Sequence, residues 1–303
     1  MSDFLVVRDL GDRLGAVVGA AAAAKADRGY GAGLLDGRQI GLFFEKPSTR
    51  TRVSAEVAIR RLGGDPIVLT SEGVGLGTRE PVVDVARVLD RMLDGVAFRV
   101  FEHRTLETLA RHSEGPVINL LSDLEHPCQA LADLATIAEH RPVGDATVAY
   151  VGDGNNVAVS LAWGVASLGG RMRIASPGGY GVDPSLLPEG IELLDDPDEA
   201  VAGADVVYTD VWTSMGKEKE GARRRVAFKG FQVNGALVDA AGKDVLVMHC
   251  LPAHRGEEIT DEVLDGPNSI VFDQAENRLH AQKVLLEALL GSRKKKQSTR
   301  GKR

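Results

Sequence analysis

The segment Phe43–Arg52 (FFEKPSTRTR) places hydroxyl and guanidinium groups where a predicted strand runs into a predicted helix. Ser48 or Thr49 can cap that helix, and the free N–H groups of a first helical turn form an anion site. Arg50 and Arg52 add positive charge, and a guanidinium can hold a phosphate with two hydrogen bonds. An ordinary capped helix with exposed arginines is the alternative. The spacing alone leaves both interpretations open.

His126 and Gln129 open a second predicted helix, in the sequence HPCQ that follows the predicted strand Val117–Leu121. Residues three apart share one face of a helix, so both side chains can point at one small ligand. Together they can donate hydrogen bonds to a carbonyl oxygen on which negative charge develops. A histidine in a first turn is more often a capping or surface residue, so this segment is weak evidence by itself.

The segment Gly152–Asn156 (GDGNN) follows the predicted strand Thr147–Val151 and superficially resembles a dinucleotide-binding turn. The third glycine of that fingerprint is missing, and the next strand ends in Ala175-Ser176-Pro177 rather than in an acid. A nicotinamide cofactor and a dehydrogenase activity are therefore disfavoured. Asn156 remains a candidate contact for a substrate carboxylate.

Two further polar segments follow apolar strands. In the first, Asp210 can pair with a substrate ammonium, and Ser214–Gly216 is a candidate loop, although an ordinary turn explains both. In the second, His249–Arg255 (HCLPAHR) combines one cysteine with two histidines. The only other cysteine is Cys128, so the spacing of a structural zinc site is absent. Neighbouring residues at a strand end point in opposite directions, which disfavours a Cys–His nucleophile.

Strand-like apolar runs alternate with helical patterns, which favours α/β architecture with parallel sheets covered on both faces. Ligands in such sheets bind beyond the carboxyl ends of the strands, where these polar segments lie. The predicted strands are 39–44, 66–69, 95–101, 117–121, 147–151, 172–175, 191–194, 205–208, 245–248 and 269–272. The predicted helices include 51–62, 82–93, 128–139, 157–168 and 275–290.

The chain divides into two predicted domains, 1–140 and 141–274, because His140–Asp145 (HRPVGD) supplies a proline and a glycine after a long helix. Each domain would be an open, mostly parallel α/β sheet with helices on both faces. The helix 275–290 could pack back on the first domain. The basic segment 292–303 is expected to be a solvated tail.

Composition excludes several classes of protein. With 303 residues, 44% hydrophobic and 26% charged, the chain resembles a soluble globular protein, and its longest early apolar run, Gly15–Ala24, is too short to span a bilayer. The net charge is −7 although 292–303 holds seven basic residues, so the acidic remainder disfavours non-specific nucleic-acid binding. Two cysteines offer no disulfide framework, which favours a cytoplasmic location.

In chain order these segments read SxRTR, HPxQ, GDxNN, DxWxSMG and HCLP. This series closely resembles the aspartate/ornithine carbamoyltransferase family from about Asp3 to Leu290, and SMG and HCLP resemble its ornithine-using members. The resemblance implies transfer of the carbamoyl group of carbamoyl phosphate to the δ-amine of L-ornithine, giving L-citrulline and phosphate for arginine biosynthesis. It implies no cofactor and no metal. It also implies a homotrimer that binds neither nucleic acid nor membrane.

The resemblance implies a role for individual residues. The ornithine contacts would be Asn156, Asp210, Ser214 and Met215. The catalytic residues would be Arg50, Arg99, His126, Gln129 and Cys250, with Cys250 orienting the amine rather than attacking. Carbamoyl phosphate would contact Ser48, Thr49, Arg50, Thr51, Arg99, His126, Gln129, Cys250, Leu251 and Arg278.

One departure concerns the loop Ser71–Glu80, where some bacterial relatives carry a glutamine that contacts carbamoyl phosphate. The matching residue is Gly75, and Arg79 nearby could contribute charge. Two alternatives stay open. One is a carbamoyltransferase for another amine, lysine or putrescine, although Asp210 with the SMG loop favours an α-amino acid. The other is a non-catalytic protein that binds a phosphometabolite.

Overall fold

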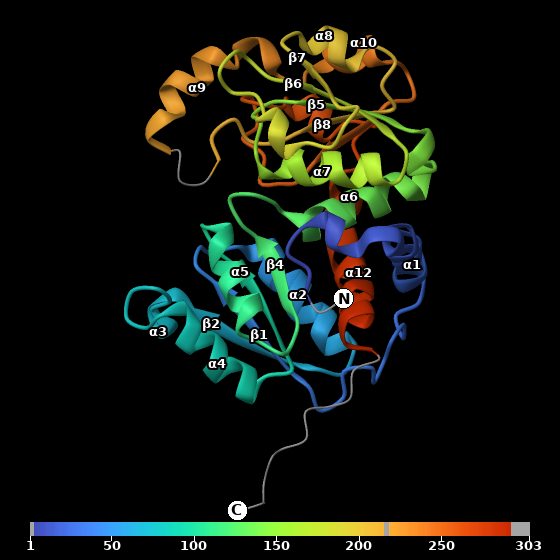
Figure 1. Cartoon of the computed structure of the whole chain (residues 1–303). Helices are drawn as coiled ribbons and strands as arrows, with labels where there is room; N and C mark the ends of the chain where they lie inside the picture. Colours follow the sequence, from blue (N-terminus) through green and yellow to red (C-terminus); the bar gives the residue numbers. More distant parts are fainter. Residues whose placement is uncertain (1–2, 215–217, 292–303) are drawn as a thin grey trace, which may run out of the picture.

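The computed structural model describes residues 3–214 and 218–291, which form two parallel sheets joined by helices (Figure 1). Met215 and the basic segment 292–303, both named by the sequence analysis, lie outside the described residues. Among the helices that the structure describes, none is long and apolar enough to cross a membrane.

The first sheet has four parallel strands in the order β2-β1-β3-β4. Alternate residues of a strand face opposite sides, and here both sides are apolar: Leu42 packs in the core shared with α2 and Phe43 in the core shared with α4 and α5. The elements are β1 (Gln39–Phe44), β2 (Asp65–Thr70), β3 (Gly95–Arg99), β4 (Val117–Leu121), α2 (Thr49–Arg61), α4 (Val82–Met92) and α5 (His103–Arg111).

The second sheet has five parallel strands in the order β7-β6-β5-β8-β9. Tyr150 on β5 packs toward α7, whereas Val151 packs in the cluster that includes α8 and α10 on the opposite face. The elements are β5 (Thr147–Val151), β6 (Arg171–Ala175), β7 (Glu192–Leu194), β8 (Val206–Thr209), β9 (Leu246–His249), α7 (Asn156–Ser167), α8 (Pro197–Val201) and α10 (Gly235–Ala241).

Three helices lie between or beside the two sheets. In Figure 1, α6 (Pro127–His140) runs along the junction next to α7, and α12 (Val271–Leu290) descends from the second sheet beside α1 (Leu14–Ala26). The helix α12 also packs against α2 and α6, and Nη1 of Arg38 donates a hydrogen bond to its Leu290 carbonyl at 2.7 Å. The C-terminal helix is thus part of the core of the first sheet.

The architecture predicted from the sequence, two parallel α/β sheets covered on both faces, is confirmed. The predicted strand Ser269–Phe272 is wrong: Ser269 makes a single bridge to Val247, and α12 begins at Val271. Neither α1 nor α5 was predicted from the sequence, and the same holds for α8 and α10. The remaining elements are short: η1 (Val7–Arg13), α3 (Ser71–Val74), η2 (Val143–Asp145), η3 (Pro184–Leu186), η4 (Glu218–Glu220), α9 (Gly221–Ala227), η5 (Lys229–Phe231) and α11 (Asp261–Leu264).

Candidate active site

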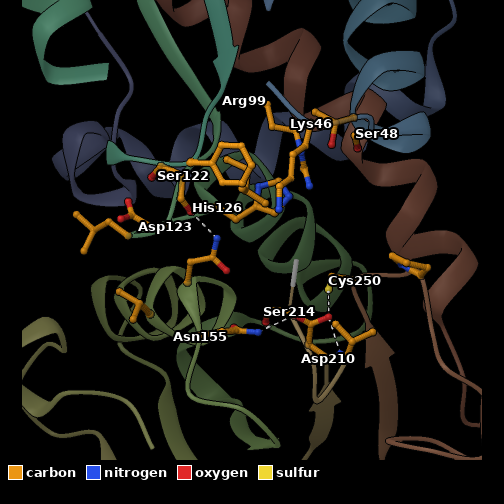
Figure 2. A pocket seen from close by; sticks show the side chains of 18 of the residues that line it. Lys46, Ser48, Arg99, Ser122, Asp123, His126, Asn155, Asp210, Ser214 and Cys250 are labelled. Carbon is orange, nitrogen blue, oxygen red and sulfur yellow. Dashed lines mark hydrogen bonds between the residues drawn. The ribbon is translucent and has the colours of Figure 1, made fainter. Parts of the chain in front are cut away.

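A cavity of about 570 Å³ opens where the carboxyl ends of both sheets face each other. One wall comes from the first sheet and carries the basic residues, and the other comes from the second and carries Asp210 and Cys250 (Figure 2). Gln129 lies just behind the wall, hydrogen-bonded to a lining residue. The predicted site residues that line the cavity are Ser48, Thr49, Arg50, Thr51, Arg99, His126, Asn156, Asp210, Ser214, Cys250, Leu251 and Arg278.

The first turn of α2 is open toward the cavity. Ser48 is the N-cap residue, but its side chain makes no capping hydrogen bond, so the predicted capping role of that hydroxyl is wrong. The N–H groups of the first turn are therefore not satisfied by a capping side chain, as an anion site requires. The structure separates the two arginines of this helix: Arg50 lines the cavity, whereas Arg52 bonds Glu56 at 2.7 Å with its side chain 54% exposed.

Arg278 reaches this wall from α12 and joins two other predicted residues. Its Nη1 donates to Oε1 of Gln129 and its Nη2 to Oγ1 of Thr51, each at 2.7 Å. Burial lowers the pKa of Arg278, and burial together with Arg278 and Arg50 lowers the pKa of Arg99 to about 10. Both guanidinium groups stay protonated at neutral pH, so the wall holds three neighbouring positive charges that favour a multivalent anion.

His126 is buried beside these cations, at 4% exposure. Burial, with the charges of Arg278 and Arg99, holds the pKa of His126 well below its usual range, so the imidazole is neutral at physiological pH. Its Nδ1 makes no hydrogen bond within the described residues. A neutral imidazole can donate one hydrogen bond without adding a fourth charge to the wall.

A buried polar network behind the wall fixes Gln129. Its Nε2 donates to Oδ1 of Asp133 at 2.8 Å, and that oxygen also accepts from Gln274 on α12 at 2.7 Å. The Tyr208 hydroxyl on β8 donates to the other oxygen at 3.1 Å. Asp133 was not predicted from the sequence. Its signal was an acid between the apolar residues Ala132 and Leu134, four residues after Gln129.

The wall from the second sheet is built around Asp210. Its Oδ2 accepts from Nδ2 of Asn155 at 2.7 Å and its Oδ1 from the Cys250 thiol at 3.0 Å (Figure 2). Burial and the Asp210 charge hold the pKa of the Cys250 thiol well above its usual range, so the sulfur carries its proton. Asn155 was missed from the sequence. Its Oδ1 also caps α7 by accepting from the N–H groups of Val157 and Ala158.

At the end of β9, the neighbouring side chains of His249 and Cys250 make different contacts. His249 contacts Glu258 at 3.0 Å through Nε2 and accepts the Leu251 N–H through Nδ1 at 2.9 Å, so both ring nitrogens are engaged. A metal held by Asp210, His249 and Cys250 would have to displace these contacts. Leu251 adopts a φ of 54°, a left-handed conformation that non-glycine residues rarely adopt and that is often found at functional sites.

The two remaining predicted ornithine contacts are held by other polar groups. Nδ2 of Asn156 donates to the carbonyl of Ser122, which follows β4 of the first sheet, at 2.6 Å. This hydrogen bond links the two walls. Ser214 bonds Asp153 at 3.4 Å, and Asp153 forms a buried ion pair with Arg224 at 2.8 Å. These contacts anchor the loop as far as Ser214.

The loop Ser71–Glu80 lies apart from the cavity. Gly75 adopts a φ of 63° as the C-cap of α3. Nη2 of Arg79 donates to the carbonyls of Gly73 and Val74 at 2.8 and 3.2 Å, so the guanidinium closes its own loop. The suggested contribution of Arg79 to this cavity does not occur within one chain.

Two family models together match nearly the whole chain. Residues 2–139 match the carbamoyl-P binding domain of the aspartate/ornithine carbamoyltransferases, and residues 144–289 match their Asp/Orn binding domain. The chain is 53% identical over 287 residues to an ornithine carbamoyltransferase of Acidothermus cellulolyticus, with 91% of this chain and 92% of the relative covered. It is 50% identical over 269 residues to one of Pyrococcus furiosus described as anabolic, with 85% of each covered.

Solved structures show the same fold. The ornithine carbamoyltransferase of Pyrococcus furiosus superposes with a TM-score of 0.93 at 46% identity, covering 97% of this chain and 98% of the other. The anabolic enzyme of Campylobacter jejuni gives a TM-score of 0.91 at 39% identity, covering 97% and 100%. With this fold, this two-walled cavity and these family matches, the chain belongs to the aspartate/ornithine carbamoyltransferase family.

Proposed function

We propose that this enzyme transfers the carbamoyl group of carbamoyl phosphate to the δ-amine of L-ornithine, producing L-citrulline and phosphate. The observation that carries the proposal is the pairing of unlike walls in one cavity. A cluster of guanidinium groups faces a carboxylate and a protonated thiol. A phosphorylated donor and an amino-acid acceptor need these complementary surfaces. The relative described as anabolic supports a role in arginine biosynthesis.

The first wall binds the donor and stabilises the charge that develops on it. Ser48, Thr49 and Arg50 at the start of α2, with Arg99, hold the phosphate. Thr51, His126, Gln129 and Arg278 surround the carbamoyl oxygen, and the neutral imidazole of His126 donates to it as it becomes an oxyanion. Donors that are already oriented need no reorganisation during the reaction. The same guanidinium groups stabilise the leaving phosphate.

The second wall binds and orients the acceptor. Asp210 and Ser214 hold the α-ammonium group, and Asn156 with the Met215 segment holds the α-carboxylate. Cys250 and the Leu251 carbonyl direct the δ-amine at the carbamoyl carbon. The neutral amine forms a C–N bond with the carbamoyl carbon, the C–O bond to phosphate breaks, and the departing phosphate takes up the proton that the nitrogen loses. Positioning of two substrates in one cavity supplies most of the acceleration.

The two domains divide the binding of the two substrates between them. We assign 1–140 to donor binding and 141–274 to acceptor binding, with 275–290 packed on the first unit. The family membership supports a homotrimer with sites near subunit boundaries. The two buried, unpaired thiols, Cys128 and Cys250, fit a reducing cytoplasm.

A steady-state assay tests the proposal directly. The purified protein is given carbamoyl phosphate with ornithine, lysine, putrescine or aspartate, and the carbamoylated product is identified by mass spectrometry. We expect ornithine to be preferred, because putrescine lacks the α-carboxylate and lysine is one methylene longer. Equal turnover with putrescine would contradict the assigned acceptor site. Absence of any carbamoylated product would contradict the activity itself.

A further inference from the structure

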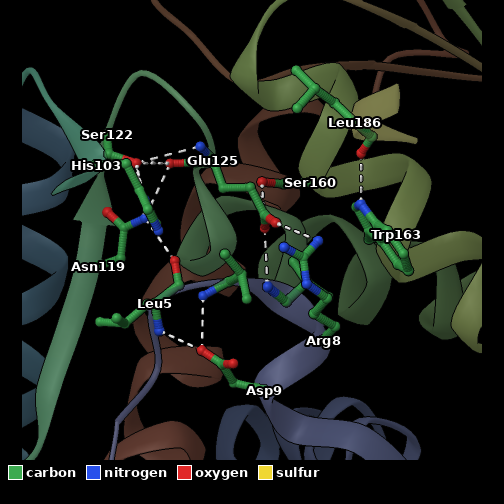
Figure 3. A network of polar contacts seen from close by, with 12 residues as sticks. Leu5, Arg8, Asp9, His103, Asn119, Ser122, Glu125, Ser160, Trp163 and Leu186 are labelled. Carbon is green, nitrogen blue, oxygen red and sulfur yellow. Dashed lines mark hydrogen bonds and ion pairs between the residues drawn. The ribbon is translucent and has the colours of Figure 1, made fainter. Parts of the chain in front are cut away.

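Glu125 is a buried acid, next to His126 in sequence, that the proposed chemistry does not use. Its side chain is 0% exposed, and its Oε2 accepts from the Val7 backbone N–H at 2.9 Å and from the Ser160 hydroxyl at 3.1 Å. The Ser160 oxygen in turn accepts from the His126 backbone N–H at 2.8 Å. Figure 3 shows this carboxyl at the centre of the network. One hydroxyl therefore links the carboxyl of Glu125 to the backbone of His126.

The linked groups come from three separate parts of the fold. Val7 lies in η1, Glu125 in the loop between β4 and α6, and Ser160 on α7 of the second sheet unit. A hydroxyl has one proton, and donating it to the carboxyl leaves the lone pairs of Ser160 for the N–H of His126. An ionised carboxylate accepts a stronger hydrogen bond than a neutral carboxyl, so it fixes that hydroxyl more firmly.

We propose that the Glu125 carboxylate is a positioning residue, which holds the backbone of His126, and with it the imidazole, through the hydroxyl of Ser160. The inference rests on the proposed carbamoyl transfer, in which that imidazole donates to the developing oxyanion. A donor stabilises such a charge only when it is held in place before the reaction.

The surroundings of Glu125 place its ionisation in the physiological range. Arg8 on η1 is the nearest cation, with Nη1 3.9 Å from Oε1, and Asp9 on the same element adds a weaker negative influence. From α7, the Ser160 hydroxyl faces the carboxyl. Burial raises the pKa of Glu125 to about 7, opposed by the hydrogen bonds it accepts and by Arg8. The positioning carboxylate thus forms as the pH rises through neutrality.

The test compares wild type with Glu125→Gln in citrulline formation between about pH 6 and pH 9, with both substrates saturating. Glutamine keeps the shape and one acceptor oxygen but cannot ionise, so it imitates the neutral carboxyl. Ionisation of ornithine affects both enzymes alike and cancels in the ratio of their kcat values. We expect the wild-type kcat divided by the Glu125→Gln kcat to be near 1 at the acidic end and to rise about three- to tenfold through a midpoint near neutrality. The KM for carbamoyl phosphate should change little.

Two further variants complete the design. Ser160→Ala removes the link, so the wild-type kcat divided by the Ser160→Ala kcat should show the same pH-dependent rise. Adding Glu125→Gln to Ser160→Ala should produce no further pH-dependent loss. Glu139→Gln, an acid on α6 paired with Lys25 at 3.0 Å, is the matched control and should give a flat ratio.

The outcomes separate the inference from the function on which it rests. A flat ratio for Glu125→Gln in an active enzyme would overturn the positioning role and leave the transferase activity standing. If Glu125→Gln fails to fold, the same comparison is made with Ser160→Ala, and a flat ratio of wild-type to variant kcat would again overturn the positioning role. Wild-type protein that forms no citrulline would overturn both proposals.

Discussion

The Cys250 thiol donates a hydrogen bond to Oδ1 of Asp210 across 3.0 Å, which joins the ends of the adjacent strands β9 and β8. The contact disfavours a nucleophilic role for this cysteine, because a neighbouring carboxylate and burial both oppose loss of its proton. The same contact orients the sulfur at the wall where the acceptor amine is proposed to bind.

Replacing Cys250 should therefore weaken binding of ornithine, the acceptor, more than binding of carbamoyl phosphate, the donor. We expect Cys250→Ala to lower turnover and raise KM for ornithine, with a combined loss in kcat/KM of about five- to tenfold, because one hydrogen bond of roughly 1 kcal/mol and its orienting effect are lost. Affinity for carbamoyl phosphate, measured by calorimetry, should change less than about twofold. Cys250→Ser, which retains a donor, should lose less. A carbamoyl mass increment on Cys250 under limiting ornithine would show instead that the sulfur attacks.

The cluster of arginines on the first wall predicts that Arg50→Ala and Arg99→Ala bind carbamoyl phosphate more weakly. Each variant removes a charge-assisted contact to phosphate, worth roughly 1.5–3 kcal/mol, so the Kd for carbamoyl phosphate should rise by about ten- to a hundredfold. Arg52→Ala is the matched control on the same helix, because its side chain bonds Glu56 outside the cavity. Calorimetric titration of the three variants with carbamoyl phosphate measures these affinities. If all three variants bind carbamoyl phosphate as tightly as wild type, the proposed phosphate site is wrong.

Asp133 predicts a pH-dependent contribution to stability. Burial raises the pKa of Asp133 to about 6 from 3.8, so the folded state holds this proton more tightly than the unfolded state does. Its favourable contribution is complete below about pH 4 and is lost as the pH rises through about 6. The unfolding free energy of wild type relative to Asp133→Asn should fall by up to about 3 kcal/mol between those limits.

Urea denaturation at several pH values measures that difference. The asparagine variant retains an acceptor for Gln129 and Gln274, so it should fold. Asp84→Asn on the exposed face of α4 serves as the control. A difference between wild type and Asp133→Asn that stays constant from pH 4 to pH 7 would show that this carboxyl has the same pKa in both states.

Direct attack by an amine predicts that turnover rises with pH at subsaturating ornithine. Only the neutral δ-amine is nucleophilic, and an alkylamine of this kind titrates near ~10.4. The value of kcat/KM for ornithine should therefore rise by at least about tenfold per pH unit between pH 6 and pH 8. A flat profile over that interval would argue that deprotonation of the amine is not required.

The sequence predicted most of the framework because both sheets are buried on two faces and their strands are continuous apolar runs. It failed at Ser269–Phe272, where a short run of apolar residues fits a strand or a helix start equally well. Here Val271 continues into a helix of 20 residues, and tertiary packing decides the outcome.

Among the site residues, those directly after strands were accessible to sequence reasoning, because parallel strands deliver their ends to one edge. Arg52 was misjudged because spacing along a helix does not reveal a local partner such as Glu56. Asp133 and Asn155 were missed because their roles depend on Gln274 and Asp210, which lie 141 and 55 residues away in the chain. Such contacts exist only once the two sheets have come together.

The position of Arg278 has a consequence for how the protein matures on the ribosome. This guanidinium bonds Thr51 across 227 residues of sequence, so the wall proposed to bind the donor lacks one of its charges until the ribosome has made α12. Early formation of the first sheet cannot by itself yield a complete donor site. A chain truncated before Arg278 would also lack most of α12, which packs in the core of the first sheet, so full-length synthesis is coupled both to folding and to completion of the site.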